Sequence, residues 1–404
     1  MKYDLIVVGG GAAGFYCAIQ TAEQNPNLKI LVLEKSKEVL SKVRVSGGGR
    51  CNVTHACFDP LEMVGYYPRG NKELLGPFHT FLCGDMMGWL SDHGVETKIE
   101  DDGRVFPSSN SSETIIHCFL DLCQKYHINI TTQTGVENVK RNADHWVINT
   151  TKGEFQTSNL LIASGSSPSA WKMIGQLGHQ IVEPVPSLFT FNIKNQLLEG
   201  LAGISLPNAE VTIKDSKLSQ SGPLLITHWG LSGPAILKLS AWAARELFDQ
   251  KYQFEILVNW IGMEEDAVLE TLQSCKKNHG KKLVINAPQF GLPKRLWQKI
   301  ITLLHLETTN FADLNAQQIN ELINYLIRCL LKVSGKSTFK EEFVTCGGID
   351  TKEINFKTME SRLLPGLYFA GEVINIDAVT GGFNFQAAWT EAHIAAKAIT
   401  QNKR

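Results

Sequence analysis

The chain has 404 residues, of which 43% are hydrophobic, 20% are charged and 34 are glycine, and its formal net charge is -1. A domain usually takes about 100 to 200 residues, so this length allows two or three domains, or one large domain with an insertion. The apolar fraction excludes a disordered protein, and the near-zero net charge gives no overall attraction to nucleic acid or to anionic membranes. Only a local basic patch would supply such an attraction.

The cysteines and the first residues favour a cytoplasmic protein. The nine cysteines are odd in number and contain no C-x-x-C pair, which fits neither a disulfide scaffold nor a zinc ribbon. A strand pattern begins at residues 3–8, without the basic and apolar regions of a signal peptide. No apolar run approaches the roughly 20 residues that cross a bilayer. We also expect no metal site, because no H-x-x-x-H or H-E-x-x-H pattern occurs.

Residues 4–8 predict a parallel strand covered on both faces, and a glycine-rich turn and a helix to about Gln24 follow at once. The turn has the spacing G-x-G-x-x-G. Gly9 permits the tight turn, Gly11 lets the backbone approach a pyrophosphate, and Gly14 lets the helix pack closely on the strand. The positive end of the helix would meet the phosphates.

A second strand at residues 29–33 ends at Glu34, whose position is 20 residues beyond Gly14. An acid at this place accepts hydrogen bonds from an adenosine ribose, and it disfavours a 2′-phosphate. The N-terminal segment therefore predicts a site for FAD or NAD rather than NADP.

Two further glycine-rich segments favour FAD. Residues 46–54, SGGGRCNVT, contain three consecutive glycines, which suggest a loop pressed against a flat ligand. Near the C-terminus, a buried strand at 367–370 is followed by Gly371 and Glu372, where open α/β sheets bind ligands. A helix opens after TGGFNF, residues 380–385, and its partial positive charge would stabilise a reduced flavin. Because two distant segments feed one sheet, we expect a split domain.

These motifs resemble those of the BaiN/YhiN-like flavoproteins, also described as aminoacetone-oxidase-type FAD-binding enzymes. GRVFP at 103–107, THWGLSGPAIL at 227–237 and TMESRLLPG at 358–366 extend the likeness over almost the whole chain. The resemblance implies an α/β fold with a glutathione-reductase-like FAD-binding Rossmann domain, discontinuous, that carries an inserted β-plus-helical domain. The expected segments are the first part of the FAD-binding domain at 1–186, the insert at 187–345 and the second part of the FAD-binding domain at 346–404.

The resemblance also implies which residues contact FAD. They are Gly9, Gly11, Ala12, Ala13, Gly14, Glu34, Lys35, Lys42, Gly49, Arg50, Cys51, Asn52, Val136 (by its backbone, to adenine), Ala163, Ser164, Gly165, Gly371, Glu372, Gly382, Asn384 and Phe385. The chain departs from the usual pattern at Ser164 and Ser166, which stand in place of Thr and Gly. It also has Asn375 where the family more often has Asp, although Asp377 remains, so a proton-transfer role is not expected of residue 375.

The resemblance implies an FAD-dependent oxidoreductase that transfers hydride between flavin N5 and a conjugated C=C or C=N bond. The family includes reductases of conjugated double bonds and of a uracil base in ribosomal RNA, so both a small molecule and RNA remain open as substrate. NADH or NADPH as the electron donor follows from the family alone, since the chain has no second G-x-G-x-x-G. A non-catalytic FAD-binding regulator is a further hypothesis. The oligomeric state is open.

Cys51, Asn52 and His228 are the candidate catalytic residues. The first two belong to the predicted flavin loop, and His228 begins the motif HWGLSGP. The alternatives are a cysteine packed in a tight loop and a hydrogen-bonded structural histidine. Cys118 and Cys123 have the spacing of a redox dithiol, but they lie on an apparent helix, where both are more simply buried small side chains.

From about 187 to 345 the glycine motifs stop, and short alternating stretches predict a small β unit followed by helices. After an Asn315 cap, one amphipathic helix is predicted by Ile319, Leu322, Ile323, Leu326, Ile327, Leu330 and Leu331. No acid occurs between Glu270 and Glu307. The cations of that stretch are Lys276, Lys277, Lys281, Lys282, Lys294, Arg295 and Lys299. Such a run is usually a solvated face, and it is also a candidate contact with RNA phosphates.

Overall fold

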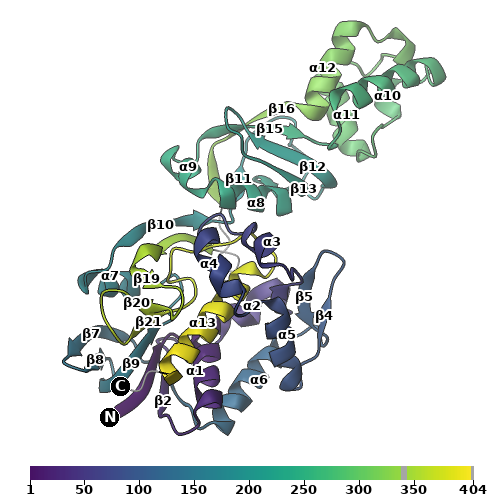
Figure 1. The fold of residues 1–404 in the computed structure, drawn as a ribbon. Coiled ribbons are helices and arrows are strands. Elements are labelled where there is room, and N and C mark those ends of the chain that lie inside the picture. The colour runs from purple at the N-terminus through teal and green to yellow at the C-terminus, as the bar shows by residue number, and fades with distance from the viewer. Residues whose placement is uncertain (338–343, 402–404) are drawn as a thin grey trace. The chain divides into compact units, whose positions relative to one another are not determined.

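The computed structural model describes residues 1–337 and 344–401. The chain divides into two compact units (Figure 1). The first combines Met1–Val185 with Val344–Arg404, and the second is Pro186–Phe343. The first unit is therefore built from both ends of the sequence.

A nine-stranded sheet with parallel central strands forms the first unit, in the order β19-β20-β21-β9-β1-β2-β6, with β7 and β8 extending from β9. Its strands are β1 (Lys2–Val8), β2 (Ile30–Leu33), β6 (Asn129–Thr131), β7 (Val136–Asn142), β8 (His145–Thr150), β9 (Gly153–Ile162), β19 (Ile354–Asn355), β20 (Glu360–Ser361) and β21 (Leu367–Phe369). Strand β9 lies between β1 and β21 and is parallel to both. The two predicted buried strands near the chain ends therefore belong to one sheet, as expected.

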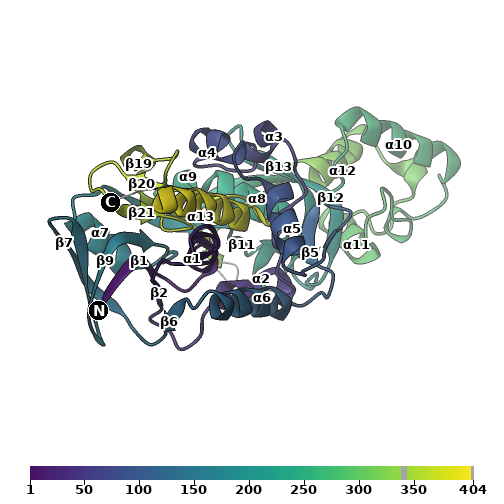
Figure 2. The same cartoon turned by 60° about the horizontal axis from the view of Figure 1, so that its bottom comes forward.

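Helices cover this sheet, and two from opposite ends of the sequence lie side by side (Figure 2). Tyr16 of the first packs edge-on against Trp389 of the last, with ring centroids 5.6 Å apart. The helices of this unit are α1 (Ala12–Gln24), α2 (Ser41–Gly49), α3 (Pro60–Val64), α4 (Asn71–Phe78), α5 (Cys83–Asp92), α6 (Ser112–Lys125), α7 (Pro168–Gln176), η3 (Thr351–Glu353) and α13 (Phe383–Gln401). The smaller sheets pair β3 (Thr54–His55), β5 (Arg104–Pro107) and β4 (Thr97–Ile99), and β10 (Ile181–Ser187) with β18 (Val344–Ile349).

The second unit is built on a seven-stranded antiparallel sheet in the order β16-β15-β12-β13-β14-β11-β17. Its strands are β11 (Thr190–Asn192), β12 (Ser205–Ile213), β13 (Ser219–Ile226), β14 (Gly230–Ser232), β15 (Phe254–Asn259), β16 (Cys329–Val333) and β17 (Gly335–Ser337). Its helices are α8 (Pro234–Trp242), α9 (Ala244–Asp249), α10 (Glu265–Asn278), η1 (Val284–Asn286), α11 (Lys294–Leu303), η2 (Phe311–Asp313) and α12 (Ala316–Ile327). One hydrophobic core, from Phe189 to Val333, joins the sheet to these helices.

The end of α12 corrects the sequence prediction. Asn315 caps the helix as expected, but the helix ends at Ile327 rather than continuing through Leu330 and Leu331. Those two leucines belong to β16, where Leu331 is buried and Leu330 is exposed. The two leucines continue the helical period, whereas the buried residues of the strand alternate as Cys329, Leu331 and Val333. Pairing with β15 decides the outcome, because it gives the backbone hydrogen bonds that a longer helix would have supplied.

All nine cysteines are buried, and they are thiols rather than members of disulfides. Cys118 and Cys123 lie on α6, and burial raises the pKa of the two thiols to about 11 and about 12. Both are therefore packed, protonated side chains, as the sequence suggested. Within residues 1–337 and 344–401, no helix is long and apolar enough to cross a membrane. Over the same residues no three His, Cys, Asp or Glu side chains gather in an arrangement that would bind a metal ion.

Candidate functional site

The first glycine-rich turn leaves open space at only one of its three motif positions. A Cβ at Gly9 would lie 2.3 Å from the Ala163 carbonyl oxygen, and one at Gly14 would lie 2.1 Å from the Gly9 carbonyl oxygen. These two positions exclude a side chain because another part of the backbone lies against each of them, at Ala163 for Gly9 and at Gly9 for Gly14. A Cβ at Gly11 would meet no atom within 4 Å. Gly11 is the N-cap of α1, and no described side chain caps this helix end. Its first amides are therefore open to an anion.

Glu34 follows β2 and fixes the turn. Its carboxylate accepts hydrogen bonds from Gly10 N at 2.8 Å and from Ser36 N at 2.7 Å. A carboxylate has about four lone-pair sites, so two amide donors leave it able to accept the hydroxyls of a ribose. Its contact with the ribose stays a prediction.

The loop at 46–54 and the start of α13 lie together. The Asn52 side-chain amide is oriented so that both its oxygen and its nitrogen have hydrogen-bond partners. Oδ1 accepts from Gly382 N at 3.0 Å, and Nδ2 donates to Thr54 O at 2.9 Å. Thr54 Oγ1 donates to Gln386 Oε1 at 2.6 Å. A Cβ at Gly382 would lie 2.5 Å from Thr54 O, so only glycine permits this approach. Two motifs more than 300 residues apart therefore form one structure, as expected.

The three consecutive glycines end α2 in a left-handed conformation. Gly47, Gly48 and Gly49 have φ values of 57°, 69° and 84°. A side chain is strained at such values, which explains why glycine occupies all three positions. A Cβ at Gly48 or Gly49 would meet no atom within 4 Å. The loop thus presents bare backbone next to open space, as a surface for a flat ligand requires.

Glu372, after β21, connects the remaining predicted segments. It forms an ion pair with Lys42 of α2, and its other oxygen accepts from Thr345 N at 3.0 Å. A Cβ at Gly165 would lie 3.8 Å from its carboxylate. The strand end of β9, the end of β21 and α2 therefore meet around one acid.

Several buried polar atoms in these segments have no hydrogen-bond partner among the described residues. They are Ser164 Oγ, Thr345 Oγ1, Asn375 Oδ1 and Glu391 Oε1. Buried polar atoms are normally paired, and because Ser164 follows β9 and Asn375 follows β21, their unpaired atoms are available to a polar ligand at these strand ends. Together with the open helix end at Gly11, they show that the residues present fit a large polar dinucleotide.

Other predicted contact residues are engaged elsewhere or exposed. Arg50 pairs with Glu100 at 2.6 Å and lies over the Phe106 ring at 3.9 Å. The Asn384 amide both accepts from and donates to the Ala378 backbone, and Phe385 stacks on Trp389 with centroids 5.5 Å apart. The remaining predicted positions are Ala12 and Ala13 in the first turn of α1, exposed Lys35 after β2, Val136 at the start of β7, Ala163 at the end of β9 and Gly371 after β21.

The three candidate catalytic residues differ in their surroundings. Cys51 is fully buried with φ at 61°, and burial raises the pKa of its thiol to about 12. The thiol is therefore protonated at neutral pH, unlike an activated nucleophile. Asn52 is buried with its amide committed to backbone groups. His228 belongs to the second unit, where it is exposed on the turn between β13 and β14.

The sequence pointed to Asp377 but not to its partner, and it missed Glu391. Asp377 is fully buried and paired with Arg69, whose Nε donates to Oδ1 at 2.6 Å. Glu391 is buried on α13, where its carboxylate accepts from Gly371 N at 2.6 Å. Its only sequence signal is an acid within the alanine-rich stretch of a helix. The pairing of Arg69 with Asp377 joins residues 308 positions apart and has no local signal.

Glu391→Gln should change how stability depends on pH. Burial raises the pKa of Glu391 from 4.5 to about 8, so the folded chain keeps a proton that the unfolded chain releases. The wild-type free energy of unfolding should therefore fall as pH rises from about 5 to 8, relative to the variant, and level off above that range. Glutamine keeps an acceptor for Gly371 N. Denaturant unfolding across this pH range tests the prediction, and parallel curves for the two proteins would contradict it.

The parallel sheet, the glycine turn after β1, the acid after β2 and the glycine-opened C-terminal helix define an FAD-type Rossmann fold. The chain belongs to the family described as HI0933-like protein Rossmann domain, whose model matches residues 3–398. Over 100% of its length the chain is 28% identical to the ribosomal RNA dihydrouridine synthase of Escherichia coli K12, covering 99% of it. It is 25% identical to the 3-dehydro-bile acid delta(4,6)-reductase of Clostridium scindens, with 98% of each chain covered.

Among solved structures, the fold is similar to that of a 3-ketosteroid-delta4-(5alpha)-dehydrogenase from Rhodococcus jostii RHA1. The TM-score is 0.54 at 13% identity, and the match covers 99% of this chain and 97% of that one. These findings confirm the predicted family resemblance and fold class, and they place the chain among the oxidoreductases. The regulator hypothesis gains no support from them.

Proposed function

We propose that the first unit binds FAD across the carboxyl ends of β1, β9 and β21. The observation that carries this proposal is the uncapped start of α1 beside the open position at Gly11. Helix amides at that place suit a pyrophosphate, and Glu34 suits the ribose. Heating the purified protein and separating the released ligand tests the cofactor. FAD is expected, and recovery of NAD, or of no nucleotide, would contradict the proposal.

The proposed reaction is reduction of a carbon–carbon double bond conjugated to a carbonyl. Dihydrouridine differs from uridine by two hydrogens across such a bond, and the bile-acid name specifies a 3-keto group with double bonds at 4 and 6. Bound FAD would supply two-electron hydride chemistry. Overall, the substrate gains a hydride and a proton while NADH or NADPH is oxidised to NAD(P)⁺.

The chain's own residues would orient this chemistry. The start of α13 carries partial positive charge, which stabilises negative charge that develops next to it. Asn52 holds this helix start in place through Gly382. We propose Asn52 as a positioning residue and the protonated Cys51 thiol as a group lining the same loop. His228 belongs to the second unit, so the proposal assigns it no step at the flavin and it stays a prediction from the sequence.

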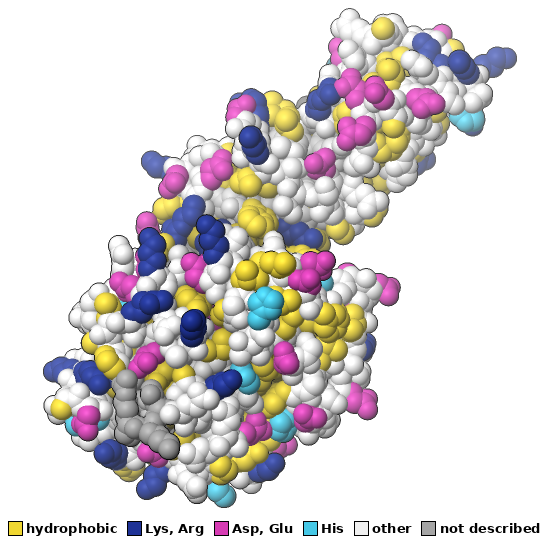
Figure 3. Space-filling view, viewed as in Figure 1, with side chains coloured by type: hydrophobic (Ala, Val, Ile, Leu, Met, Phe, Trp, Pro, Cys, Tyr) yellow, Lys and Arg dark blue, Asp and Glu magenta, His cyan; other side chains and the backbone are white. Residues whose placement is uncertain are grey.

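We further propose that the substrate is a uracil base in ribosomal RNA. The full-length likeness to the synthases of Escherichia coli and Haemophilus influenzae supports it, at 28% and 29% identity. A local feature adds support, since residues 271–306 contain no acid. Figure 3 shows dark-blue Lys and Arg side chains at the end of the second unit that carries α10 and α11, with magenta Asp and Glu side chains between them. The exposed cations of this basic segment are Lys277, Lys281, Lys282, Lys294 and Arg295.

Ribosomal RNA from a strain without the gene should lack one dihydrouridine that the parent strain contains. Mass spectrometry of nuclease fragments detects it, and expression of the gene from a plasmid should restore it. A small enone such as a 3-keto steroid is the second candidate, favoured by the bile-acid relative. Unchanged RNA modification in the strain, together with enone-dependent NAD(P)H oxidation by the protein, would replace the RNA substrate with this candidate.

A further inference from the structure

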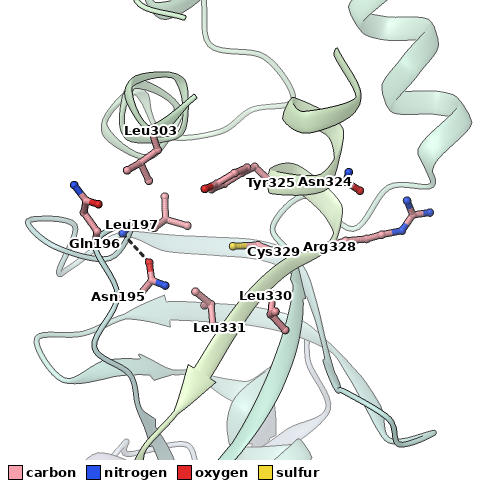
Figure 4. A pocket seen from close by; sticks show the side chains of 10 residues that line it. All are labelled: Asn195, Gln196, Leu197, Leu303, Asn324, Tyr325, Arg328, Cys329, Leu330 and Leu331. Carbon is pink, nitrogen blue, oxygen red and sulfur yellow. Dashed lines mark hydrogen bonds between the residues drawn. The ribbon is translucent and has the colours of Figure 1, made fainter. Parts of the chain in front are cut away.

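The second unit contains a cavity of about 400 Å³ where its sheet meets its helices. Edge strand β16 forms its floor, and α12, the end of α11 and the turn at 195–197 surround it (Figure 4). All of these segments share one hydrophobic core, so the cavity belongs to a single packed body. Its size falls in the range of about 300 to 1,000 Å³ that is typical of small-ligand sites.

The lining combines one aromatic ring with leucines and amide side chains. Tyr325 points across the cavity toward Leu197 and Leu303 (Figure 4). The amides come from Asn195, Gln196 and Asn324. The Asn195 side chain is fixed, since its Oδ1 accepts from Leu197 N at 2.8 Å, which leaves its NH₂ group as a donor. An aromatic face with apolar residues opposite suits a flat ring, and amides supply the paired donors and acceptors that base edges require.

Cations approach the cavity from two sides. Arg295, Lys299 and Leu303 are four residues apart on α11, so they share one helix face that ends at the cavity. Arg295 also donates to Gly200 O, just beyond the turn that lines the cavity. On the other side, Arg328 extends outward from the cavity and is 52% exposed, with Glu265 as its ion-pair partner (Figure 4). A guanidinium has five donors, so this ion pair leaves others for a phosphate.

We propose that this cavity holds one unpaired nucleotide of the RNA, distinct from the uracil that is reduced. The inference rests on the proposed RNA substrate. The base would stack on Tyr325, its edge would meet the amides, and the adjoining phosphates would meet Arg295, Lys299 and Arg328. The acid-free basic segment lies on the same helical part of the chain and would hold the flanking RNA without regard to sequence.

Fluorescence anisotropy of the full-length protein with a labelled single-stranded ribosomal RNA fragment tests the site. Tyr325→Leu removes the stacking face and keeps an apolar side chain, and it should weaken binding about tenfold. Tyr325→Phe keeps the ring and should bind as the wild type does. Asn320→Ala, on the exposed face of α12 outside the cavity, is the control and should have no effect. Wild-type affinity for Tyr325→Leu would overturn the proposal.

Two further measurements distinguish a site for an RNA base from a site for a free nucleotide. Gln196 is exposed, so Gln196→Ala leaves the fold intact and should reduce discrimination between bases; unchanged discrimination counts against the site. Free uridine and adenosine monophosphates should compete only at concentrations far above that of the RNA, and equal affinity would make this a site for a free nucleotide instead. A wild-type protein that binds no RNA overturns both this inference and the RNA substrate. RNA binding that Tyr325→Leu leaves unchanged overturns this inference alone.

Discussion

Gly11→Val should yield a folded protein that purifies without FAD. Gly11 has φ at -95° and ψ at -167°, an extended conformation that valine adopts readily, and its Cβ would meet no protein atom within 4 Å. The added Cβ would therefore enter the open space assigned to the pyrophosphate. Losing two hydrogen bonds to a charged phosphate, each worth about 1.5 to 3 kcal/mol, corresponds to at least about a hundredfold weaker binding.

Two control variants make this result specific. Gly88 lies on α5 with no atom within 4 Å of its added Cβ, so Gly88→Val should keep the cofactor. Gly14→Val should fail differently, by misfolding, because its Cβ would lie 2.1 Å from the Gly9 carbonyl oxygen. Flavin absorbance and circular dichroism together distinguish these outcomes. A yellow, folded Gly11→Val protein would refute the placement of the pyrophosphate.

Reversing three charges in the basic segment should separate RNA binding from flavin chemistry. Lys277, Lys281 and Lys282 are exposed, and changing all three to Glu should weaken binding of ribosomal RNA on the order of a hundredfold. Each lost contact with a single strand lowers the slope of log K against log salt by about 0.7, so the slope should fall by roughly 2. Anaerobic reduction of the flavin by NADH or NADPH should stay unchanged.

A control variant reverses two charges elsewhere on the same unit. Lys217 and Lys251 are exposed and lie outside the acid-free segment, so changing both to Glu should leave the salt slope near that of the wild type. If the control variant lost as much RNA affinity per reversed charge as the triple variant, the overall charge of the protein rather than the basic segment would determine RNA binding. Full RNA affinity in the triple variant would remove the basic segment from the RNA site.

Local features of the fold were predictable from the sequence because local rules govern them. The strand, glycine turn and helix at the N-terminus follow from a run of apolar residues and the spacing of Gly9, Gly11 and Gly14. The periodicity of apolar side chains predicted secondary structure less reliably where one residue fits both a helix and a strand. Leu331 fits both the helical stripe and the alternation of buried residues at Cys329, Leu331 and Val333, and pairing with β15 selects the strand.

The candidate site was predictable in outline but not in its contacts. The sequence suggested that the loop at 46–54 and the segment at 380–385 approach one ligand, and the structure joins them through Asn52 and Gly382. It gave no sign that Arg69 neutralises Asp377, since no periodicity connects positions so distant. The cavity around Tyr325 draws on separate segments between residues 195 and 331, so it exists only after folding.

We propose that this chain, an oxidoreductase of the HI0933-like family, uses FAD to reduce a double bond of uracil in ribosomal RNA. The most direct test of this claim is a purified reaction without oxygen, containing the FAD-loaded protein, NADH or NADPH and unmodified ribosomal RNA. We predict that one uridine gains the mass of two hydrogen atoms, and that this gain requires both the FAD and the nicotinamide donor. An RNA that remains unmodified while the same protein reduces a small enone would contradict the claim.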